Sequence, residues 1–538
     1  MNNIVALPVL LPLLGAGVSL ALRGRPLAQR FVSISFLSAV VVIAAYLMWT
    51  TDQHGPQVLW VGAWPQPLGI VLVADRLSAL MLLVSSTVTL IVVIFSIGQG
   101  VADRDEATPI TIYYPTYLIL AAGIANAFLA GDLFNLFVGF EVLLFASYVL
   151  LTLGGTGERI RAGTTYVVVS LLSSLLFLVS IAVIYAATGT INLAQLAQRI
   201  ADLNPSVSLV LQLLLLTVFA IKAAVFPMSA WLPDSYPTAP APVTAVFAGL
   251  LTKVGIYAII RTQTLLFPHS PLSGLLMWAA LLTMLVGILG AVSQSDIKRM
   301  LSFTLVSHIG YMVFGVALGT EEGYAGAIFY VVHHIAIQSA LFLIAGLIDR
   351  VGGSTSVLKL GGLAAISPLL GLLFFAGIMN LGGIPPFSGF LGKVALMRAG
   401  IDFGTPLAVV RVVAGVVTSL LTLYALAKAW TQAFWRSPNR AVVRAVATAE
   451  DLDIYHLADH NDYELERRDV SEAESETEDR PRRRALPRSM VAAASVMVAL
   501  SMALTVLAGP LYSYSARAAH DLLKQTPYAE AVLKGPPS

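Results

Sequence analysis

The chain contains fourteen long apolar segments, separated by short polar or Pro/Gly-containing turns. A helix needs about 20 apolar residues to cross the hydrocarbon core of a bilayer. Hydrophobic residues make up 57% of the chain and charged residues only 12%, far less charge than a soluble domain carries. We therefore expect an all-α polytopic membrane protein with these transmembrane helices: 4–22, 31–49, 73–97, 112–130, 132–153, 164–187, 207–229, 241–261, 272–291, 300–318, 325–348, 364–390, 404–434 and 489–510.

The distribution of Lys and Arg over the short loops predicts the orientation. One set of loops carries ten basic residues and the opposite set carries four. Because short cytoplasmic loops are enriched in Lys and Arg, the richer set is expected in the cytoplasm, and both termini outside a bacterial cytoplasmic membrane. Residues 4–22 count as the first crossing, since no basic region precedes them. The poorer set contains Arg76, Arg199, Arg261 and Arg398.

Residues 436–488 form a long polar stretch between the last two apolar segments. From Glu450 to Asp479 this stretch contains thirteen acidic residues and two Arg. Such a composition cannot bury enough apolar surface to fold alone. We expect a solvated cytoplasmic linker, and a docking surface for a partner is the alternative.

Four ionisable side chains lie inside the apolar segments: Glu141, Lys222, Lys253 and Lys393. Each charge at the centre of a membrane helix costs roughly 2.5–3.5 kcal/mol on insertion scales. One carboxylate can neutralise one lysine in an inert ion pair, but two lysines then remain unexplained. A hydrated relay explains all four, because desolvation favours the neutral amine and a nearby carboxylate favours the charged form. The row therefore predicts proton transfer at mid-membrane depth.

Three histidines are candidate intermediate sites of the same relay: His308, His333 and His334. Histidine changes charge near neutral pH, which suits a proton shuttle. The alternative for each is a hydrogen-bonded packing residue. Adjacent residues on a helix point about 100° apart, so we expect only one of His333 and His334 to face the relay and no metal site between them.

Proline and glycine interrupt two of the segments that contain buried lysines. Pro227 follows Lys222, and Pro385 and Pro386 precede Lys393. Proline breaks a helix, and paired broken helices in corresponding halves are typical of transport sites. We therefore expect two inverted five-helix repeats. The expected organisation is three N-terminal helices (1–111), a first repeat (112–261), a second repeat (272–435), the linker (436–488) and a last helix with a tail (489–538).

These residues lie in segments that resemble a known family. KAAVFPMSAWLPDSYPTAPAPVTAVFAGLLTKVGIYAIIR (222–261), SQSDIKRMLSFTLVSHIGYM (293–312) and GGIPPFSGFLGK (382–393) are similar to the antiporter-like subunits shared by respiratory complex I and the Mrp-type multisubunit sodium/proton antiporters. Within that family, GDLFNLFVGFEVLLFASYVLL (131–151) resembles the D-type subunit of the Mrp complexes.

The resemblance implies a role for each residue of the row. Glu141 is expected to pair with Lys222, the central proton-binding lysine. Lys253 is expected to connect onward to the histidines, and Lys393 to end the second half-channel. The chain departs from many relatives at Gln338, where they carry a lysine.

The leading hypothesis is thus a secondary transporter, not an enzyme: a subunit of a multisubunit sodium/proton antiporter. Its expected partners are the other Mrp subunits, protons, sodium ions and the lipid bilayer, with no nucleic acid, cofactor or metal. The alternative within the family is a proton-pumping subunit of complex I. A membrane enzyme is a further alternative, for which Asp234 is the one tempting polar loop residue, and a scaffold is another. No dinucleotide or P-loop motif is present.

Overall fold

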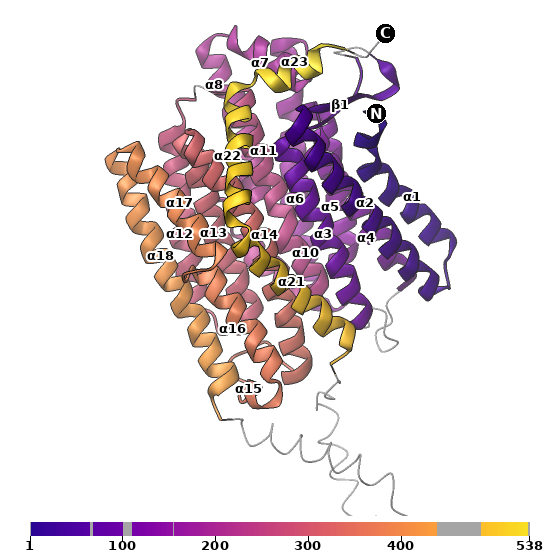
Figure 1. Cartoon of the computed structure of the whole chain (residues 1–538), viewed down its shortest axis with the longest axis vertical. Coiled ribbons are helices and arrows are strands. Elements are labelled where there is room, and N and C mark those ends of the chain that lie inside the picture. The colour runs from indigo at the N-terminus through magenta and orange to yellow at the C-terminus, as the bar shows by residue number, and fades with distance from the viewer. Residues whose placement is uncertain are drawn as a thin grey trace, which may run out of the picture.

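A computed structural model describes residues 2–64, 68–99, 110–153, 155–268, 270–437 and 486–535. Most of the acidic linker predicted at 436–488 lies outside these residues. The described chain folds into a bundle of long, roughly parallel helices (Figure 1). Within it, thirteen helices are long and apolar enough to cross a membrane. The expected all-α polytopic fold is confirmed.

The long helices follow the expected segments closely. A helix can span a bilayer because its backbone N–H and C=O groups bond to one another within the helix. In chain order the long helices are α1 (Leu7–Ala21), α2 (Pro26–His54), α3 (Arg76–Gln99), α4 (Ile110–Leu129), α5 (Leu133–Thr152), α6 (Gly157–Thr188), α8 (Pro205–Ala223), α10 and α11 (Ala241–Val246 and Thr252–Leu265), α12 (Ser273–Val292), α13 (Ile297–Leu318), α14 (Glu321–Gly352), α16 (Pro368–Gly382), α17 (Ser388–Phe403), α18 (Pro406–Trp430) and α21 (Arg488–Val506).

Shorter elements, which hydropathy does not predict, join the spans. They are α7 (Leu193–Ala201), α9 (Trp231–Ser235), α15 (Leu363–Ile366), α22 (Ala508–Lys524) and α23 (Thr526–Leu533), with 3-10 turns at Asn2–Ala6, Val61–Ala63 and Tyr236–Thr238. A two-stranded antiparallel hairpin pairs β1 (Gln57–Trp60) with β2 (Val71–Ala74). Single turns of π-helix occupy Phe247–Leu251 and Thr431–Trp435.

Three interruptions of regular helix occur in the interior. Helix α8 ends at Ala224, which adopts a left-handed conformation with φ of 58°. The span Ala241–Leu265 contains the π-helical turn between α10 and α11. The segment expected as one span at 364–390 is instead split: α16 ends before Gly383, and α17 begins at Ser388. Both proline-containing breaks predicted from the sequence are therefore present.

The centre of the bundle is formed by the Ala241–Leu265 span and α14, whose apolar windows are completely buried by the surrounding helices. Helix α14 contacts α13, α17, α21 and α22. Groups on these central helices are shielded from lipid, so polar side chains there can meet one another. The inverted relation of the two repeats stays a prediction.

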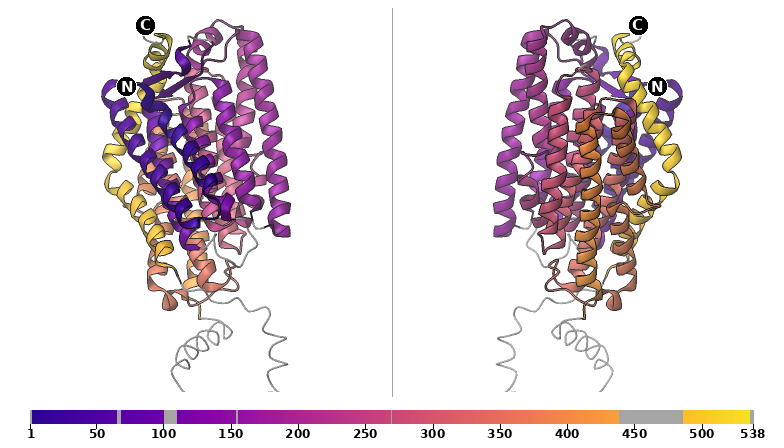
Figure 2. Two further views of the ribbon diagram at one scale, coloured as in Figure 1. Left: turned by 90° about the vertical axis from the view of Figure 1, so that its right-hand side faces the viewer. Right: turned by 90° about the vertical axis from the view of Figure 1, so that its left-hand side faces the viewer.

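The chain begins and ends at the same end of the bundle (Figure 2). Helix α21 runs obliquely from the opposite end to the middle, and α22 continues along the bundle toward the end where the N-terminus lies (Figure 1). There α23 packs on α7 and β1. The poorer set of basic residues, expected in loops, lies in helices: Arg76 is the first residue of α3, Arg199 lies in α7, Arg261 is buried within α11 and Arg398 lies in α17.

Candidate functional site

The first cluster joins Glu141, Ser174 and Lys222, from α5, α6 and α8. Lys222 lies in the last turn of α8, which ends two residues later at the left-handed Ala224. The carbonyl end of a helix carries partial negative charge and stabilises a cation there. The Lys222 Nζ atom lies 4.8 Å from the centre of the Phe140 ring. The break in α8 thus places a buried ammonium beside the middle of α5.

Ser174 connects the two charged groups. Its hydroxyl donates to the half-buried Glu141 carboxylate, and Lys222 Nζ donates to the Ser174 Oγ atom at 3.3 Å. Within the described residues, Glu141 and Lys222 form no direct ion pair. The expected pairing of the two is therefore mediated by a serine hydroxyl.

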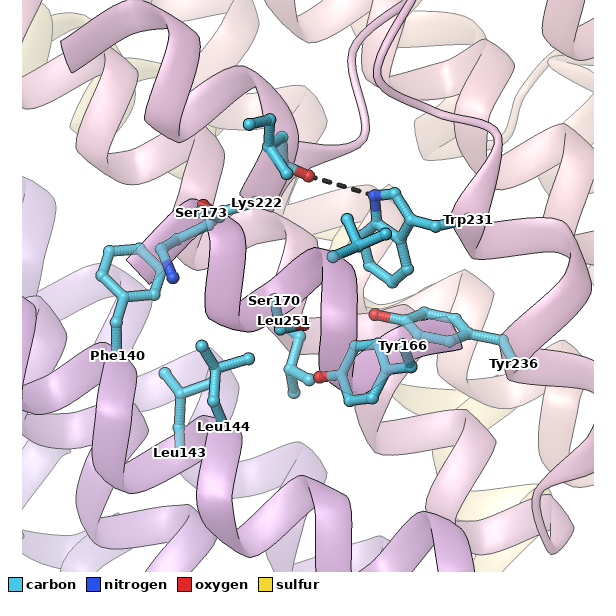
Figure 3. Close-up of a pocket in the computed structure, with 12 residues that line it drawn as sticks. Phe140, Leu143, Leu144, Tyr166, Ser170, Ser173, Lys222, Trp231, Tyr236 and Leu251 are labelled. Atoms are coloured by element: carbon cyan, nitrogen blue, oxygen red, sulfur yellow. Dashed lines mark hydrogen bonds between the residues drawn. The ribbon is translucent and has the colours of Figure 1, made fainter. Parts of the chain in front are cut away.

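A small cavity borders Lys222 (Figure 3). Its walls include Phe140 and the hydroxyl-bearing side chains of Tyr166, Ser170, Ser173 and Tyr236. The cavity has a volume of about 20 Å³ accessible to water, which is room for about one water molecule. In Figure 3 the Lys222 amine points toward the Phe140 ring, and Trp231 Nε1 donates to the Ile221 carbonyl oxygen at 3.2 Å.

Lys253 is completely buried in the first turn of α11, directly after the π-helical turn. A π-helical turn shifts the hydrogen-bond pattern by one residue and often marks a functional site. Lys253 Nζ donates to the Ala248 carbonyl oxygen in that turn at 2.5 Å. No carboxylate contacts Lys253 in the part of the chain that the structure describes, so backbone dipoles are what stabilise its charge.

The histidines form a second cluster with Tyr330. His308 Nδ1 lies 2.9 Å from the Tyr330 hydroxyl, and the His308 and His334 rings are 5.1 Å apart, centre to centre. His333 Nδ1 lies 2.9 Å from the Ser388 Oγ atom, across the break between α16 and α17. Both adjacent histidines therefore contact polar or ring side chains, His334 on the side of α13 and His333 on the side of α17. Which of them takes part in the relay stays a prediction.

Four ring nitrogens of these buried histidines have no hydrogen-bond partner within the described chain: His308 Nε2, His333 Nε2 and both nitrogens of His334. Buried polar atoms of this kind are normally satisfied by protein or by water. Packing alone does not account for three such histidines in one cluster.

Lys393 lies at the carbonyl end of α16. Its Nζ atom donates to the Leu381 and Gly382 carbonyl oxygens, both at 3.1 Å, and to the Ser419 Oγ atom at 2.9 Å. Asn380 Oδ1 accepts from the Gly389 amide at 3.0 Å and thereby fixes the start of α17. The break between α16 and α17 thus supplies carbonyl oxygens to Lys393, whereas Lys222 Nζ bonds to the Ser174 hydroxyl.

Within the described residues, neither Gln338 nor Asp234 forms a hydrogen bond with a side chain of the row, although Gln338 lies one helical turn after His334 on α14. Gln338 is completely buried and donates to the Leu301 carbonyl oxygen at 2.8 Å. Asp234 is exposed and pairs with Arg299 at 2.9 Å. Over the described ranges, no group of three or more His, Asp or Glu side chains is arranged to hold a metal ion.

The sequence did not reveal the neutral side chains of the two clusters or those around Lys393. They are Ser174, Tyr330, Ser388, Asn380 and Ser419. One signal was visible, because SLLSS (170–174) places three serines in an otherwise apolar segment. Within the described residues, no hydrogen bond joins Lys222 to Lys253 or His333 to Lys393. Protons that pass between these pairs therefore need water or side-chain movement.

Comparisons with known proteins agree with this architecture. Residues 130–422 match the family model described as NADH:quinone oxidoreductase/Mrp antiporter, transmembrane. The chain is 38% identical over 538 residues to the D-type subunit of the Na(+)/H(+) antiporter of Alkalihalophilus pseudofirmus, covering 99% of this chain and 100% of the relative.

Two solved structures share the fold. A chain of the Mrp complex from Dietzia sp. DQ12-45-1b superposes with a TM-score of 0.86 and 34% identity, covering 99% of this chain and 100% of that one. A chain of respiratory complex I from Thermus thermophilus superposes with a TM-score of 0.77 and 23% identity over 97% of this chain and 99% of that chain. The chain therefore belongs to the NADH:quinone oxidoreductase/Mrp antiporter family of membrane proteins.

Proposed function

We infer that this chain is the D-type subunit of a multisubunit sodium/proton antiporter of Mrp type, assembled with other Mrp subunits in the membrane. The full-length similarity to the D-type Na(+)/H(+) antiporter subunit, at 38% identity, supports this function. Similarity to the complex I chain is weaker, at 23% identity. The alternative of a quinone-driven proton pump is accordingly less well supported.

Within such a complex, the row of buried groups carries protons. Glu141, Ser174 and Lys222 form the first station, Lys253 links it to the cluster of His308, His334, Tyr330 and His333, and Lys393 forms the last station. The observation that carries this proposal is that each lysine is buried and held by helix-end carbonyls or a hydroxyl instead of a direct ion pair. A lysine held in this way can release its proton without leaving a carboxylate unpaired.

The complex acts as a secondary transporter that exchanges cytoplasmic sodium for external protons. It lies in the bacterial cytoplasmic membrane with both termini outside. The concentration of Lys and Arg in one set of loops supports that orientation, as does the location of both termini at one end of the bundle. The inverted repeats, 112–261 and 272–435, each contribute one proline-containing break to the row.

Neutralisation of the first station tests the proposal. Glu141→Ala and Lys222→Ala are each expected to abolish sodium-dependent proton exchange in everted membrane vesicles, because each removes a proton-binding group. The amount of assembled complex is expected to stay unchanged. Asp402→Ala is a matched control, since this exposed carboxylate pairs only loosely with Arg398, at 3.7 Å. Exchange at the wild-type level in either variant of the first station contradicts the proposal.

A further inference from the structure

The link between the two charges of the first station is a single hydroxyl group. Ser174 is 5% exposed. Its oxygen accepts a hydrogen bond from Lys222 Nζ at 3.3 Å and its proton is donated to Glu141 Oε1. Both hydrogen bonds therefore run in one direction, from the ammonium through the hydroxyl to the carboxylate.

This arrangement differs from the usual behaviour of serine in a membrane helix. Serine hydroxyls commonly donate back to a carbonyl oxygen three or four residues earlier in the same helix. Ser180, further along α6, does so: it donates to the Leu176 carbonyl oxygen at 2.6 Å. Ser174 instead donates across to α5. Its hydroxyl is thus available to the charged groups, and the helix does not require it.

We propose that Ser174 is a proton-transfer residue that passes protons between Lys222 and Glu141. In the forward step an N–H bond of the Lys222 ammonium breaks and its proton binds the Ser174 oxygen. At the same time the Ser174 O–H bond breaks and that proton binds the Glu141 carboxylate. The serine stays neutral, the lysine becomes an amine and the glutamate becomes a carboxylic acid, so protons and charge balance.

After one transfer, the protons of the first station must be rearranged before a second transfer can occur. After the transfer, the new Ser174 hydroxyl proton points toward the Lys222 amine, and the protonated Glu141 points toward the serine oxygen. The hydroxyl must rotate before a second proton can follow in the same direction. Lys222 also borders the cavity lined by Ser170 and Ser173. The Lys222 amine can be reprotonated from the side of this cavity.

The test uses two substitutions of the same shape. Threonine keeps the hydroxyl of Ser174 and valine replaces it with a methyl group, while both add the same branch to α6. Ser174→Thr is expected to retain sodium-dependent proton exchange in everted vesicles that contain the whole complex. Ser174→Val is expected to lower it by about a hundredfold or more, the scale of a lost proton-transfer group, with the same amount of assembled complex.

Equal exchange in the two variants overturns the inference, whether both keep exchange or both lose it. If the added branch prevents assembly, Ser174→Ala replaces them and is expected to lose exchange and shift its pH profile. Unchanged exchange with an unchanged profile in Ser174→Ala also overturns the inference. Ser180→Ala is the matched control, because it removes a buried hydroxyl from the same helix that bonds only within α6.

This inference rests on the proposed function, and the two fail separately. Glu141→Ala that retains exchange contradicts the proposed relay as a whole. Glu141→Ala that loses exchange beside a fully active Ser174→Val contradicts only the role of Ser174.

Discussion

The three lysines of the row lie where regular helix is interrupted. Lys222 occupies the last turn of α8, Lys253 bonds to a carbonyl oxygen of a π-helical turn, and Lys393 bonds to two carbonyl oxygens at the end of α16. Carbonyl groups at the end of a helix have no amide partner in that helix and carry partial negative charge, and two of them, from Leu381 and Gly382, accept directly from Lys393. They stabilise an ammonium without a fixed carboxylate, which is a suitable environment for a proton that has to leave.

The sequence could identify these lysines but could not identify their partners. A charge in an apolar segment is conspicuous because it costs several kcal/mol. A serine in the same place costs little, since it usually bonds to its own helix, so Ser174 gave no comparable signal. Gln338 is similar: its amide donates to Leu301, and nothing in the sequence distinguishes that contact from a role in the relay.

The two adjacent histidines give a prediction at this scale. His334 faces His308 on α13, and His333 faces Ser388 on α17. Because the row turns between these helices, we expect both His333→Gln and His334→Gln to slow sodium-dependent proton exchange by about tenfold or more. His520→Gln is the control. The His520 side chain is exposed and bonds to Glu321 at 2.9 Å, and it has no hydrogen bond to a residue of the row within the described chain. Loss of exchange in only one of the two variants means that the row does not turn here.

At the scale of elements, hydropathy predicted the spans because each apolar helix must cover the hydrocarbon core. It did not predict α7, α22 and α23, which are too short or too polar to span, nor the hairpin of β1 and β2. Their positions depend on tertiary contacts. Gly131 illustrates this: its amide donates to the Val71 carbonyl oxygen at 2.8 Å, which ties the start of α5 to the hairpin.

The start of α5 gives a pH-dependent prediction. Asp132 caps this helix by accepting from the Asn135 amide at 2.6 Å. Burial raises the pKa of Asp132 to about 6, although backbone hydrogen bonds lower it. The folded protein therefore binds this proton more tightly than the unfolded chain does. Its stabilising contribution is complete below the ordinary pKa of 3.8 and is lost as the pH rises through 6.

Asparagine at this position keeps an acceptor for the cap and cannot ionise. We expect Asp132→Asn to raise the midpoint of thermal unfolding in detergent at pH 8, where the wild-type carboxylate is charged, and to raise it less at pH 5, which lies between the ordinary pKa of 3.8 and the folded-state pKa of about 6. A gain of the same size at both pH values contradicts this account.

At the scale of the whole molecule, a buried ion pair ties three distant parts of the chain together. Asp75, between β2 and α3, binds Arg261 of α11 through two hydrogen bonds of 2.7 and 2.8 Å. Tyr528 of α23 lies over the guanidinium at 4.9 Å. Hydropathy and the count of basic residues predicted that Arg261 lies in a loop. Its partner Asp75 is 186 residues away in the sequence, so the sequence did not predict the ion pair.

Removal of one partner of this pair is expected to destabilise the protein. Asp75→Ala leaves the Arg261 guanidinium buried without its counter-ion, which costs about 3–5 kcal/mol. The double variant Asp75→Asn, Arg261→Gln replaces the charges with amides and is expected to recover most of the loss in detergent melting experiments. The exposed pair of Arg398 and Asp402 supplies the control, since Asp402→Ala is expected to change stability little. A double variant as unstable as the summed losses of Asp75→Asn and Arg261→Gln, each measured alone, contradicts this explanation.

Acid is not expected to release the same link under working conditions. Burial raises the pKa of Asp75, but the charge and hydrogen bonds of Arg261 lower it further, so the pKa stays below its ordinary value of 3.8. The contribution of the pair to stability is therefore fully present above that value and is lost only as the pH falls through the lower, folded-state pKa.

The orientation of the whole chain can be tested directly, because the sequence contains no cysteine. A single introduced cysteine is then the only thiol available to a label. Thr526 is exposed at the end of the bundle that holds both termini, and Lys359 is exposed near α15 at the opposite end. A membrane-impermeant maleimide is expected to label Thr526→Cys in intact cells and Lys359→Cys only in everted vesicles. The reverse pattern contradicts the orientation inferred from Lys and Arg. Labelling of both sites from one side means that the chain crosses the membrane an even number of times between Lys359 and Thr526, which also contradicts the expected topology.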